Sequence, residues 1–202
     1  MHELSEHSVA ADPFQEFAAW YAEARAVHGD DADAMVVASA DATGAPSARV
    51  VLLRGHDERG FCFFTNYESR TGRELIENPR GAIVLHWPGL RRQVRATGVV
   101  ERVSEAESDA YWHRRPVASR FGAWASRQSR PVESRAVLEA AAVAEEVRLA
   151  GTDVDRPDFW GGFRLVPDTI ELWLHRDDRL HDRVQYHRVA RTAPWTITRL
   201  QP

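Results

Sequence analysis

Met35-Val-Val-Ala-Ser39, Arg49-Val-Val-Leu-Leu53 and Phe61-Cys-Phe-Phe-Thr65 are three short, largely apolar runs that follow one another with polar turns between them. Asp41-Ala-Thr-Gly44 and Asp57-Glu-Arg-Gly60 are the turns, and both end on glycine. Apolar runs of about five residues bounded by such turns are typical of strands joined as hairpins. The segment therefore predicts an antiparallel β-meander.

Similar runs further along the chain predict more strands, with helical signals between them. Strands are predicted at Ala82–His86, Gln93–Val103, Phe163–Val166, Ile170–Leu174, Arg183–His187 and Trp195–Leu200. Helices are predicted from Asp12-Pro13 to Gly29, over 69–76, from a capping box of Ser104 and Glu107 to Pro116, and over 119–129 and 134–150. Short strands at regular spacing favour a mainly β fold with helices (α+β), in which a closed or split barrel carries the helices on its outside.

The chain is predicted to form a single domain over residues 12–202, because the C-terminal strands are expected to complete the same barrel. Residues 1–11 carry no periodic pattern and are expected to form a short flexible arm.

The composition argues against several classes of protein. The 202 residues carry a net charge of −4, which is unlike a general nucleic-acid binder. The N-terminus lacks a signal-peptide pattern, and no apolar run approaches the roughly 18 residues of a membrane span. We therefore expect a cytoplasmic protein without membrane contact. Cys62 is the only cysteine and the nine histidines form no H-x-H or H-x-x-x-H pair, so no metal site is predicted.

The run Arg179-Leu-His-Asp-Arg183 is the densest group of functional side chains. If it is extended, Arg179, His181 and Arg183 project to one side of the sheet, where two guanidinium groups and an imidazole suit a planar, anionic ligand. The alternative is a charged sheet edge that prevents aggregation.

Two further sets of residues could bind phosphate near the meander. Arg49 and Arg54 stand at either end of an apolar strand and face opposite ways unless a bulge or the strand end redirects one of them. Thr65, Ser69 and Arg70 lead into a predicted helix N-terminus, where backbone N–H groups favour anions. The simpler interpretations are surface charge for the arginine pair and an ordinary N-cap at Ser69.

A third set lies on the predicted helix before Pro116. Tyr111 and Arg115 are four residues apart, and Ser119 extends their face if the chain stays helical. This set could hold a second phosphate, or it could be a solvated helix face. Neutral hydrogen-bonding groups are available at Gln93, Gln128 and Ser129, and flat apolar surfaces at Trp160 and Trp173.

In their order, the motifs resemble those of the pyridoxine (pyridoxamine) 5'-phosphate oxidases. The motifs are R-V-V-L-L-R at 49–54, F-F-T-N-x-x-S-R at 63–70, R-R-Q-V at 91–94, Y-W-H-R-R-P at 111–116, G-A-W-A-S-R-Q-S at 122–129, F-W-G-G-F-R at 159–164 and R-L-H-D-R at 179–183. The resemblance implies a split-barrel flavoprotein, usually a homodimer with FMN at the subunit interface. It also implies that pyridoxamine or pyridoxine 5'-phosphate is oxidised to pyridoxal 5'-phosphate while oxygen is reduced to hydrogen peroxide.

The same resemblance assigns roles to individual residues. It implies FMN contacts at Arg49, Phe64, Thr65, Ser69, Arg70, Gln93, Gln128, Ser129, Trp173 and Arg183. It implies substrate contacts at Arg54, Tyr111, Arg115, Ser119, Arg179 and His181, of which Arg179 and His181 would also be catalytic. A flavin accepts hydride, so the protein is expected mainly to position the reacting carbon and supply charge.

The chain departs from the family pattern at three positions. Arg54 and Thr71 stand where the family usually has lysine, and Phe64 replaces a common tyrosine. Two alternatives therefore stay open: a phenazine-biosynthesis type of FMN oxidase that aromatises a reduced tricyclic compound, and a non-catalytic flavin or pyridoxal phosphate binding protein. Tyr111, Arg115 and Ser119 favour the vitamin B6 reaction.

Overall fold

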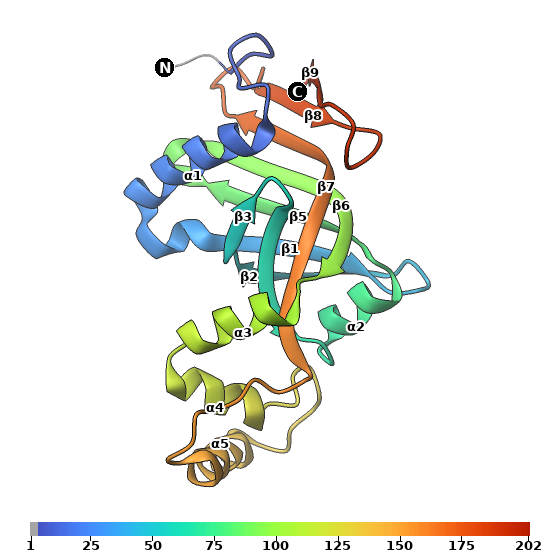
Figure 1. The fold of residues 1–202 in the computed structure, drawn as a ribbon. Helices are drawn as coiled ribbons and strands as arrows, with labels where there is room; N and C mark the ends of the chain where they lie inside the picture. The colour runs from blue at the N-terminus through green and yellow to red at the C-terminus, as the bar shows by residue number, and fades with distance from the viewer. Residues whose placement is uncertain (1–3) are drawn as a thin grey trace.

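The computed structural model describes residues 4–202 as a curled antiparallel sheet with helices around it (Figure 1). The strand order is β2-β1-β5-β6-β7-β4-β3, and β8 and β9 extend the sheet from β7. The strands are β1 Ala34–Ala40, β2 Pro46–Leu52, β3 Gly55–Asp57, β4 Gly60–Asn66, β5 Arg80–Trp87, β6 Arg92–Arg102, β7 Trp160–Leu174, β8 Asp182–His187 and β9 Thr196–Arg199. The helices are α1 Pro13–His28, α2 Arg70–Glu77, α3 Glu105–Arg114, α4 Val117–Ala125 and α5 Arg135–Leu149.

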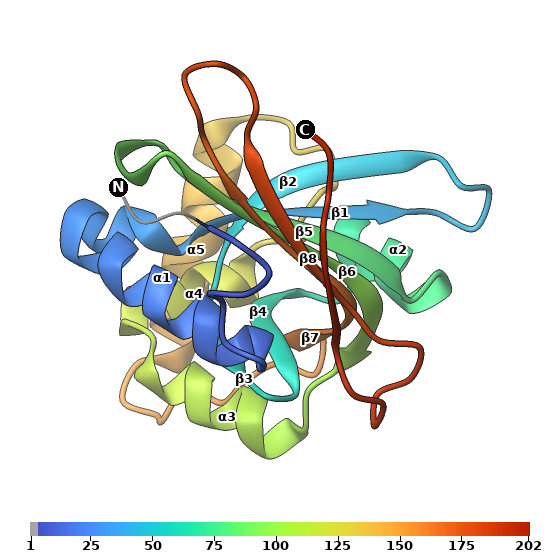
Figure 2. The same ribbon diagram turned by 90° about the horizontal axis from the view of Figure 1, so that it is seen from above.

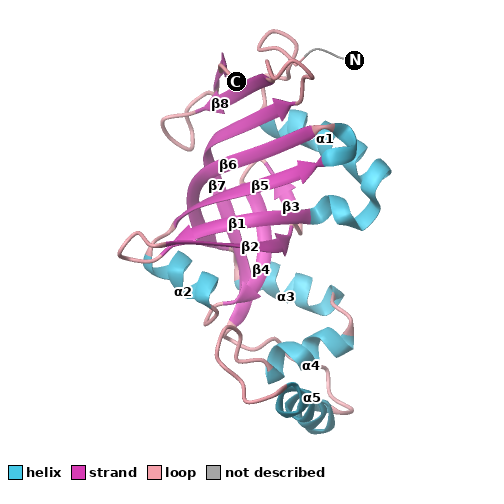
Figure 3. Ribbon diagram, turned by 180° about the vertical axis from the view of Figure 1, so that it is seen from behind, coloured by secondary structure: helices cyan, strands magenta, loops and turns pink. Residues whose placement is uncertain are grey.

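Helices cover two sides of the sheet and leave it as a half-barrel. Helix α1 lies across one end, whereas α3, α4 and α5 gather at the other end of β7 (Figures 1 and 2). Viewed from behind, the sheet is a continuous curved layer with α2 at its side (Figure 3). The prediction of an α+β split barrel is confirmed. No helix within residues 4–202 combines the length and the apolar character that crossing a membrane requires.

The main core lies between α1 and the concave face of the sheet. Phe17 of α1 is fully buried and its ring lies 4.8 Å from that of Phe61 on β4. Met35, Ile83 and Leu172 are also fully buried, so strands β1, β5 and β7 contribute to the same cluster. Burial of this apolar surface is the main stabilising contribution to the half-barrel.

Strand β7 is longer than the sequence indicates. Phe163–Val166 and Ile170–Leu174 were expected as two strands because Pro167 cannot donate to a ladder, but they form parts of one strand. The register of β6 against β7 shifts between Thr97 and Gly98, opposite Pro167. A Cβ at Gly98 would lie 2.0 Å from the Val166 carbonyl oxygen, so only glycine allows β6 to approach β7 this closely. The register shift at this point lets β7 continue through Pro167 as one strand.

The prediction of an extended run over 179–183 is wrong in its first half. Residues 175–181 form the loop between β7 and β8, and β8 begins only at Asp182. Arg179 has φ of 64°, in the left-handed region, and the Leu180 N–H donates to Asp178. The alternation that would align Arg179, His181 and Arg183 therefore does not exist.

Two other predicted boundaries change. The helix expected over 119–129 is α4, which begins at Val117 and ends at Ala125, so Gln128 and Ser129 lie in the following turn. Ser129 has φ of 69°, which a helix cannot contain.

The described part of the N-terminal arm is packed against the sheet. Leu4 is buried in the main core, and the Tyr186 hydroxyl donates to the Ala10 carbonyl. Residues 4–11 thus contact β8 and its neighbours, residues 1–3 lie outside the described residues, and the flexibility of the arm over residues 1–11 stays a prediction. The extent of a single domain over residues 12–202 stays a prediction.

Candidate functional site

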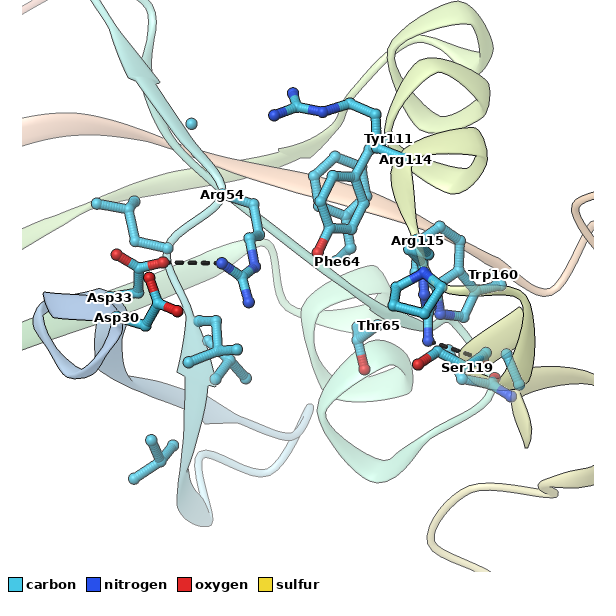
Figure 4. Close-up of a pocket in the computed structure, with 18 of the residues that line it drawn as sticks. Asp30, Asp33, Arg54, Phe64, Thr65, Tyr111, Arg114, Arg115, Ser119 and Trp160 are labelled. Atoms are coloured by element: carbon cyan, nitrogen blue, oxygen red, sulfur yellow. Dashed lines mark hydrogen bonds and ion pairs between the residues drawn. The ribbon is translucent and has the colours of Figure 1, made fainter. Parts of the chain in front are cut away.

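A pocket of about 1410 Å³ opens between β2, β4, the end of α1 and helices α3 and α4. Figure 4 shows Arg54 and Asp33 on one wall and Tyr111, Arg115 and Trp160 on the other. The predicted site residues that line it are Arg49, Arg54, Phe64, Thr65, Tyr111, Arg115, Ser119 and Gln128. Arg49 and Arg54 both reach it because β2 ends at Leu52 and the chain turns before Arg54. The strand end therefore redirects one arginine, as the sequence allowed.

The Tyr111, Arg115 and Ser119 set converges although the chain is not continuously helical. Helix α3 ends at Arg114, Arg115 is extended, and α4 starts after Pro116. The Arg115 guanidinium donates to the Ser119 carbonyl at 3.0 Å and lies 4.6 Å from the Trp160 ring centre. Burial lowers the pKa of Arg115, but a guanidinium remains charged at neutral pH. This end of the pocket therefore presents a fixed cation, a phenol and a hydroxyl.

Three aromatic rings form the pocket wall beside this cation. The Phe64 and Tyr111 rings stack with centres 4.0 Å apart and planes inclined by 21°. Trp160 lies nearly parallel to both, at 5.7 Å from Phe64 and 6.1 Å from Tyr111. Phe64, which replaces a common tyrosine, thus supports the orientation of Tyr111.

Helix α3 is fixed to the barrel at its N-terminus. Ser104 and Glu107 form the predicted capping box, and Arg164 of β7 donates to Glu107 at 2.7 Å. The hydrogen bond from Arg164, with those from Ser104, lowers the pKa of Glu107 to about 2 despite its partial burial. This contact sets where α3 presents Tyr111.

A buried carboxylate holds the opposite wall of the pocket. Asp33, whose side chain is 8% exposed, accepts from the Tyr21 hydroxyl at 2.6 Å, from Arg25 at 3.0 Å and from Arg54 at 2.8 Å. Burial and the hydrogen bond to Asp33 raise the pKa of Tyr21 to about 12. Arg54 is therefore oriented by the ion pair of its Nη1 with Asp33, and its guanidinium has further N–H donors.

The residues of the predicted phosphate cradle contact one another beside the pocket, and phosphate binding by them stays a prediction. The Gln128 side-chain oxygen accepts from the Thr65 hydroxyl at 3.4 Å, and the Ser129 hydroxyl accepts from the Arg70 N–H at 3.1 Å. Ser69 is fully buried and caps α2 by accepting from the Gly72 N–H at 3.0 Å. Ser69, Arg70 and Ser129 are not among the residues that line the large pocket. The simple interpretation of Ser69 as an N-cap is confirmed.

The remaining predicted residues form a second group on β6, β7 and β8. Gln93 pairs with Trp173 across one ladder, and Trp173 pairs with Arg183 across the next. Directly opposed residues present their side chains on one face of a sheet, so these three form a row. Arg183 donates to Glu171 at 2.9 Å, and Glu171 is almost fully buried.

His181 joins this second group from the 175–181 loop. Its ring lies 4.7 Å from Trp173 and 5.0 Å from His175. The Arg176 N–H donates to His181 Nδ1 at 3.0 Å, so Nδ1 carries no proton and the neutral ring holds its proton on Nε2. Arg179 is exposed on the same loop.

The two groups are separated by the length of β7. Trp160 lines the pocket at one end of the strand, and Trp173 belongs to the row at the other end. Thirteen residues at about 3.3 Å each place them roughly 40 Å apart along the strand. Within one chain the structure therefore does not bring the second group to the pocket.

Several pocket residues were missed by the sequence analysis. Tyr21, Arg25 and Asp33 come from α1 and the turn after it, where a helix and an acidic stretch give no sign of a site. Glu74, which is buried and accepts from Arg70 at 2.7 Å and from Ser39 at 2.6 Å, was also missed. A charged residue on a short helix usually faces solvent, so no local signal marks it.

The sequence of the chain matches two families of known proteins. Residues 22–148 match the family described as "Pyridoxamine 5'-phosphate oxidase", and residues 160–202 match the "Pyridoxine 5'-phosphate oxidase C-terminal dimerisation region". The chain belongs to the pyridoxamine 5'-phosphate oxidase family. The second match includes Trp173, His181 and Arg183 of the second group.

Individual relatives cover nearly the whole chain. The pyridoxine/pyridoxamine 5'-phosphate oxidase of Ralstonia pickettii is 53% identical over 194 residues, which cover 96% of this chain and 91% of that protein. The one from Bordetella petrii is 52% identical over 200 residues, covering 98% and 93%. The resemblance indicated by the sequence motifs is confirmed.

Solved structures of the family share the fold. PhzG from Burkholderia lata, in complex with tetrahydrophenazine-1-carboxylic acid, has a TM-score of 0.92 at 31% identity and covers 100% of this chain and 98% of that one. A pyridoxamine 5'-phosphate oxidase-related, FMN-binding protein from Nostoc punctiforme has a TM-score of 0.74 at 18% identity, covering 96% and 99%. The second likeness concerns the fold alone.

The Glu107 contact predicts how stability depends on pH. The pKa of Glu107 is about 2 in the folded chain and 4.5 as its ordinary value, so its contribution to stability is present above pH 4.5 and is lost as the pH falls towards 2. Glu107→Gln should flatten the loss of stability over this range, measured by urea unfolding at several pH values. Glu139→Gln, which alters an exposed pair on α5, is the control. Equal slopes for wild type and Glu107→Gln would contradict the assignment.

Proposed function

We propose that the protein is an FMN-dependent oxidase that converts pyridoxamine 5'-phosphate or pyridoxine 5'-phosphate to pyridoxal 5'-phosphate, with oxygen reduced to hydrogen peroxide. The observation that carries the proposal is the convergence of Tyr111, Arg115 and Ser119 on one end of the pocket. A guanidinium beside hydroxyl donors suits a phosphate monoester. Arg54, fixed by Asp33, supplies a second cation across the pocket.

The side chains present fit FMN as the cofactor. Arg49 and Thr65 line the pocket and suit the flavin phosphate and ribityl chain, with Ser69, Arg70, Gln128 and Ser129 beside them. The row of Gln93, Trp173 and Arg183 combines an amide, a flat indole and a cation, which suits the polar edge and plane of the ring. When bound, FMN supplies the hydride acceptor and passes the electrons to oxygen.

A complete site requires two copies of the chain. Gln93, Trp173 and Arg183 do not line the pocket of their own chain, and Trp173 is thirteen residues along β7 from Trp160 at the pocket. Trp173 and Arg183 of the row fall within the match to a dimerisation region. A homodimer with the row of one subunit facing the pocket of the other gives two FMN sites at the interface.

The proposed chemistry gives the protein mainly a positioning role. Arg115, Tyr111 and Ser119 anchor the phosphate, which fixes the distance from the anchor to the reacting carbon. Arg179 is suited to cover the substrate ring, since a guanidinium stacks on aromatic faces. The neutral ring of His181 carries its proton on Nε2, so it can donate a hydrogen bond to a polar edge of the substrate or transfer a proton.

A second candidate function is supported by one of the solved relatives. PhzG from Burkholderia lata binds tetrahydrophenazine-1-carboxylic acid and shares the fold at a TM-score of 0.92. We infer that oxidation of a reduced phenazine is the alternative reaction. A carboxylate on a tricyclic ring places its charge differently from a phosphate monoester, so Arg115 should matter less for that substrate.

Arg115 provides the test of substrate class. FMN-loaded wild type should release peroxide with pyridoxamine 5'-phosphate and far less with unphosphorylated pyridoxamine. Arg115→Gln should raise KM for the phosphate ester by about ten- to a hundredfold, because a charged hydrogen bond of about 1.5–3 kcal/mol is lost. Arg148→Gln on the surface of α5 should leave KM unchanged.

The result that would contradict the vitamin B6 reaction is a rate independent of the phosphate group. Turnover of a reduced phenazine carboxylic acid in place of both B6 phosphates would support the alternative reaction. FMN binding without turnover of any of these compounds would identify a non-catalytic flavin-binding protein.

Mixed dimers test whether the site is shared. Arg115→Gln damages the pocket and Arg183→Gln damages the row, so each homodimer should be nearly inactive. If each site uses one group from each subunit, a mixed dimer has one intact site. Random mixing of equal amounts should then restore about a quarter of wild-type activity. If both groups acted within one chain, mixing would restore none.

A further inference from the structure

The loop of residues 175–181, which carries Arg179 and His181, contacts Arg91 beside β6 through the His175 N–H and through an ion pair with Asp177. It follows β7 at Leu174 and precedes β8 at Asp182, and residues 177–180 are exposed. A segment without ladder hydrogen bonds is ordered only if other contacts offset its conformational entropy. The contacts at the two ends of the loop can offset this entropy.

Asp182 closes the loop at its base. Its Oδ2 accepts from two nitrogens of Arg176, from Nε at 2.8 Å and from Nη2 at 2.5 Å. The backbone N–H of Arg176 in turn donates to His181 Nδ1. Arg176 therefore contributes to the orientation of the His181 ring, together with the contacts of that ring with Trp173 and His175.

Arg199 occupies the other oxygen of Asp182 and connects it to the N-terminal segment. Its Nη1 donates to Asp182 Oδ1 at 2.9 Å, its Nε to Glu6 at 2.8 Å, and its Nη2 to the Leu4 carbonyl at 3.0 Å. Burial alone would raise the pKa of Asp182, but the hydrogen bonds from Arg176 and Arg199 outweigh it and lower the pKa. The carboxylate therefore stays charged and keeps both arginines.

Residues 4–11 are themselves anchored. Leu4 is 5% exposed within the main core, the Ala10 carbonyl accepts from Tyr186 at 2.7 Å, and the Ala10 N–H donates to Glu16 at 3.0 Å. β9 pairs only with β8, so the N-terminal segment and Arg199 together brace the last hairpin of the sheet. Figure 1 shows the N-terminal segment lying next to β8 and β9.

We propose that Glu6, Arg199 and Asp182 form a clamp through which the N-terminal segment positions the 175–181 loop and thereby His181 and Arg179. These are positioning residues, because they act through Arg176 and do not line the pocket. The effect on catalysis rests on the proposed function of His181 and Arg179. The positioning of the 175–181 loop by the clamp does not depend on that function.

The test compares Arg199→Gln with Arg191→Gln in the FMN-loaded full-length protein. Arg191 lies in the same C-terminal region but pairs with the exposed Glu101 at 3.3 Å, away from the loop. Hydrogen exchange of the backbone amides of residues 175–181 should speed up about tenfold in Arg199→Gln, as expected for loss of a charged hydrogen bond. It should not change in Arg191→Gln.

The ¹⁵N spectrum of His181 gives a readout that general destabilisation would not produce. In the wild type the neutral ring should show a proton on Nε2 alone, and in Arg199→Gln the two neutral forms should mix. Turnover of pyridoxamine 5'-phosphate should fall about tenfold while FMN stays bound. Glu6→Gln is a milder second variant for the case that Arg199→Gln does not fold. It should produce smaller changes in the same directions.

The outcomes separate the clamp from the proposed function. Unchanged loop exchange and an unchanged His181 spectrum in a folded Arg199→Gln variant, or in Glu6→Gln if the first variant does not fold, would overturn the clamp. Faster exchange in the variants, with a wild type that oxidises neither B6 phosphate, would keep the clamp and reject the proposed function.

Discussion

Strand β7 spans fifteen residues without a break, and it pairs with β4 at one end, with β6 along its length and with β8 at the other end. The ladders with its neighbours hold this curled strand in place, so its two ends lie at different parts of the sheet. It holds Trp160 beside the pocket and Trp173 beside Gln93 and Arg183. The separation of the two groups of polar residues, and with it the proposal of a shared site, follows from this one strand.

Buried carboxylates orient the arginines on which anion recognition would rest. Asp33 accepts from Arg54, Glu74 from Arg70 and Glu171 from Arg183, and the three side chains are 3–8% exposed. Burying a charge is costly unless it is paired, so each arginine is held as the partner of its carboxylate. A paired guanidinium still has N–H groups for a ligand, which gives direction as well as charge.

The sequence predicts best those features that local rules determine. The meander, the N-cap at Ser69 and the capping box of Ser104 and Glu107 depend on residues a few positions apart, and the structure contains all of them. The continuity of β7 was missed because it depends on the contact of Gly98 with Val166, about 70 residues away in sequence. The strand limits at Leu174 and Arg183 were predicted closely, but the extended conformation considered for 179–181 was wrong, because alternating residue types in a charged run resemble a strand.

The sequence predicted which residues could belong to the candidate site, but it did not predict how they are arranged in the fold. The motif resemblance named eight residues that line one pocket, and it also named Gln93, Trp173 and Arg183, which lie at the other end of the sheet. Asp33 and Glu74 could not be found locally, because their burial results from tertiary packing around α1 and α2.

The central claim is that one flavin site is built from two chains. Native mass spectrometry of the protein loaded with FMN tests it most directly, since the mass gives both the number of chains and the number of bound flavins. The account predicts a dimer with two FMN molecules, and it predicts that Arg183→Gln, altered only in the distant row, loses FMN as Arg49→Gln does. A monomer that binds one FMN with undiminished affinity in Arg183→Gln would contradict it.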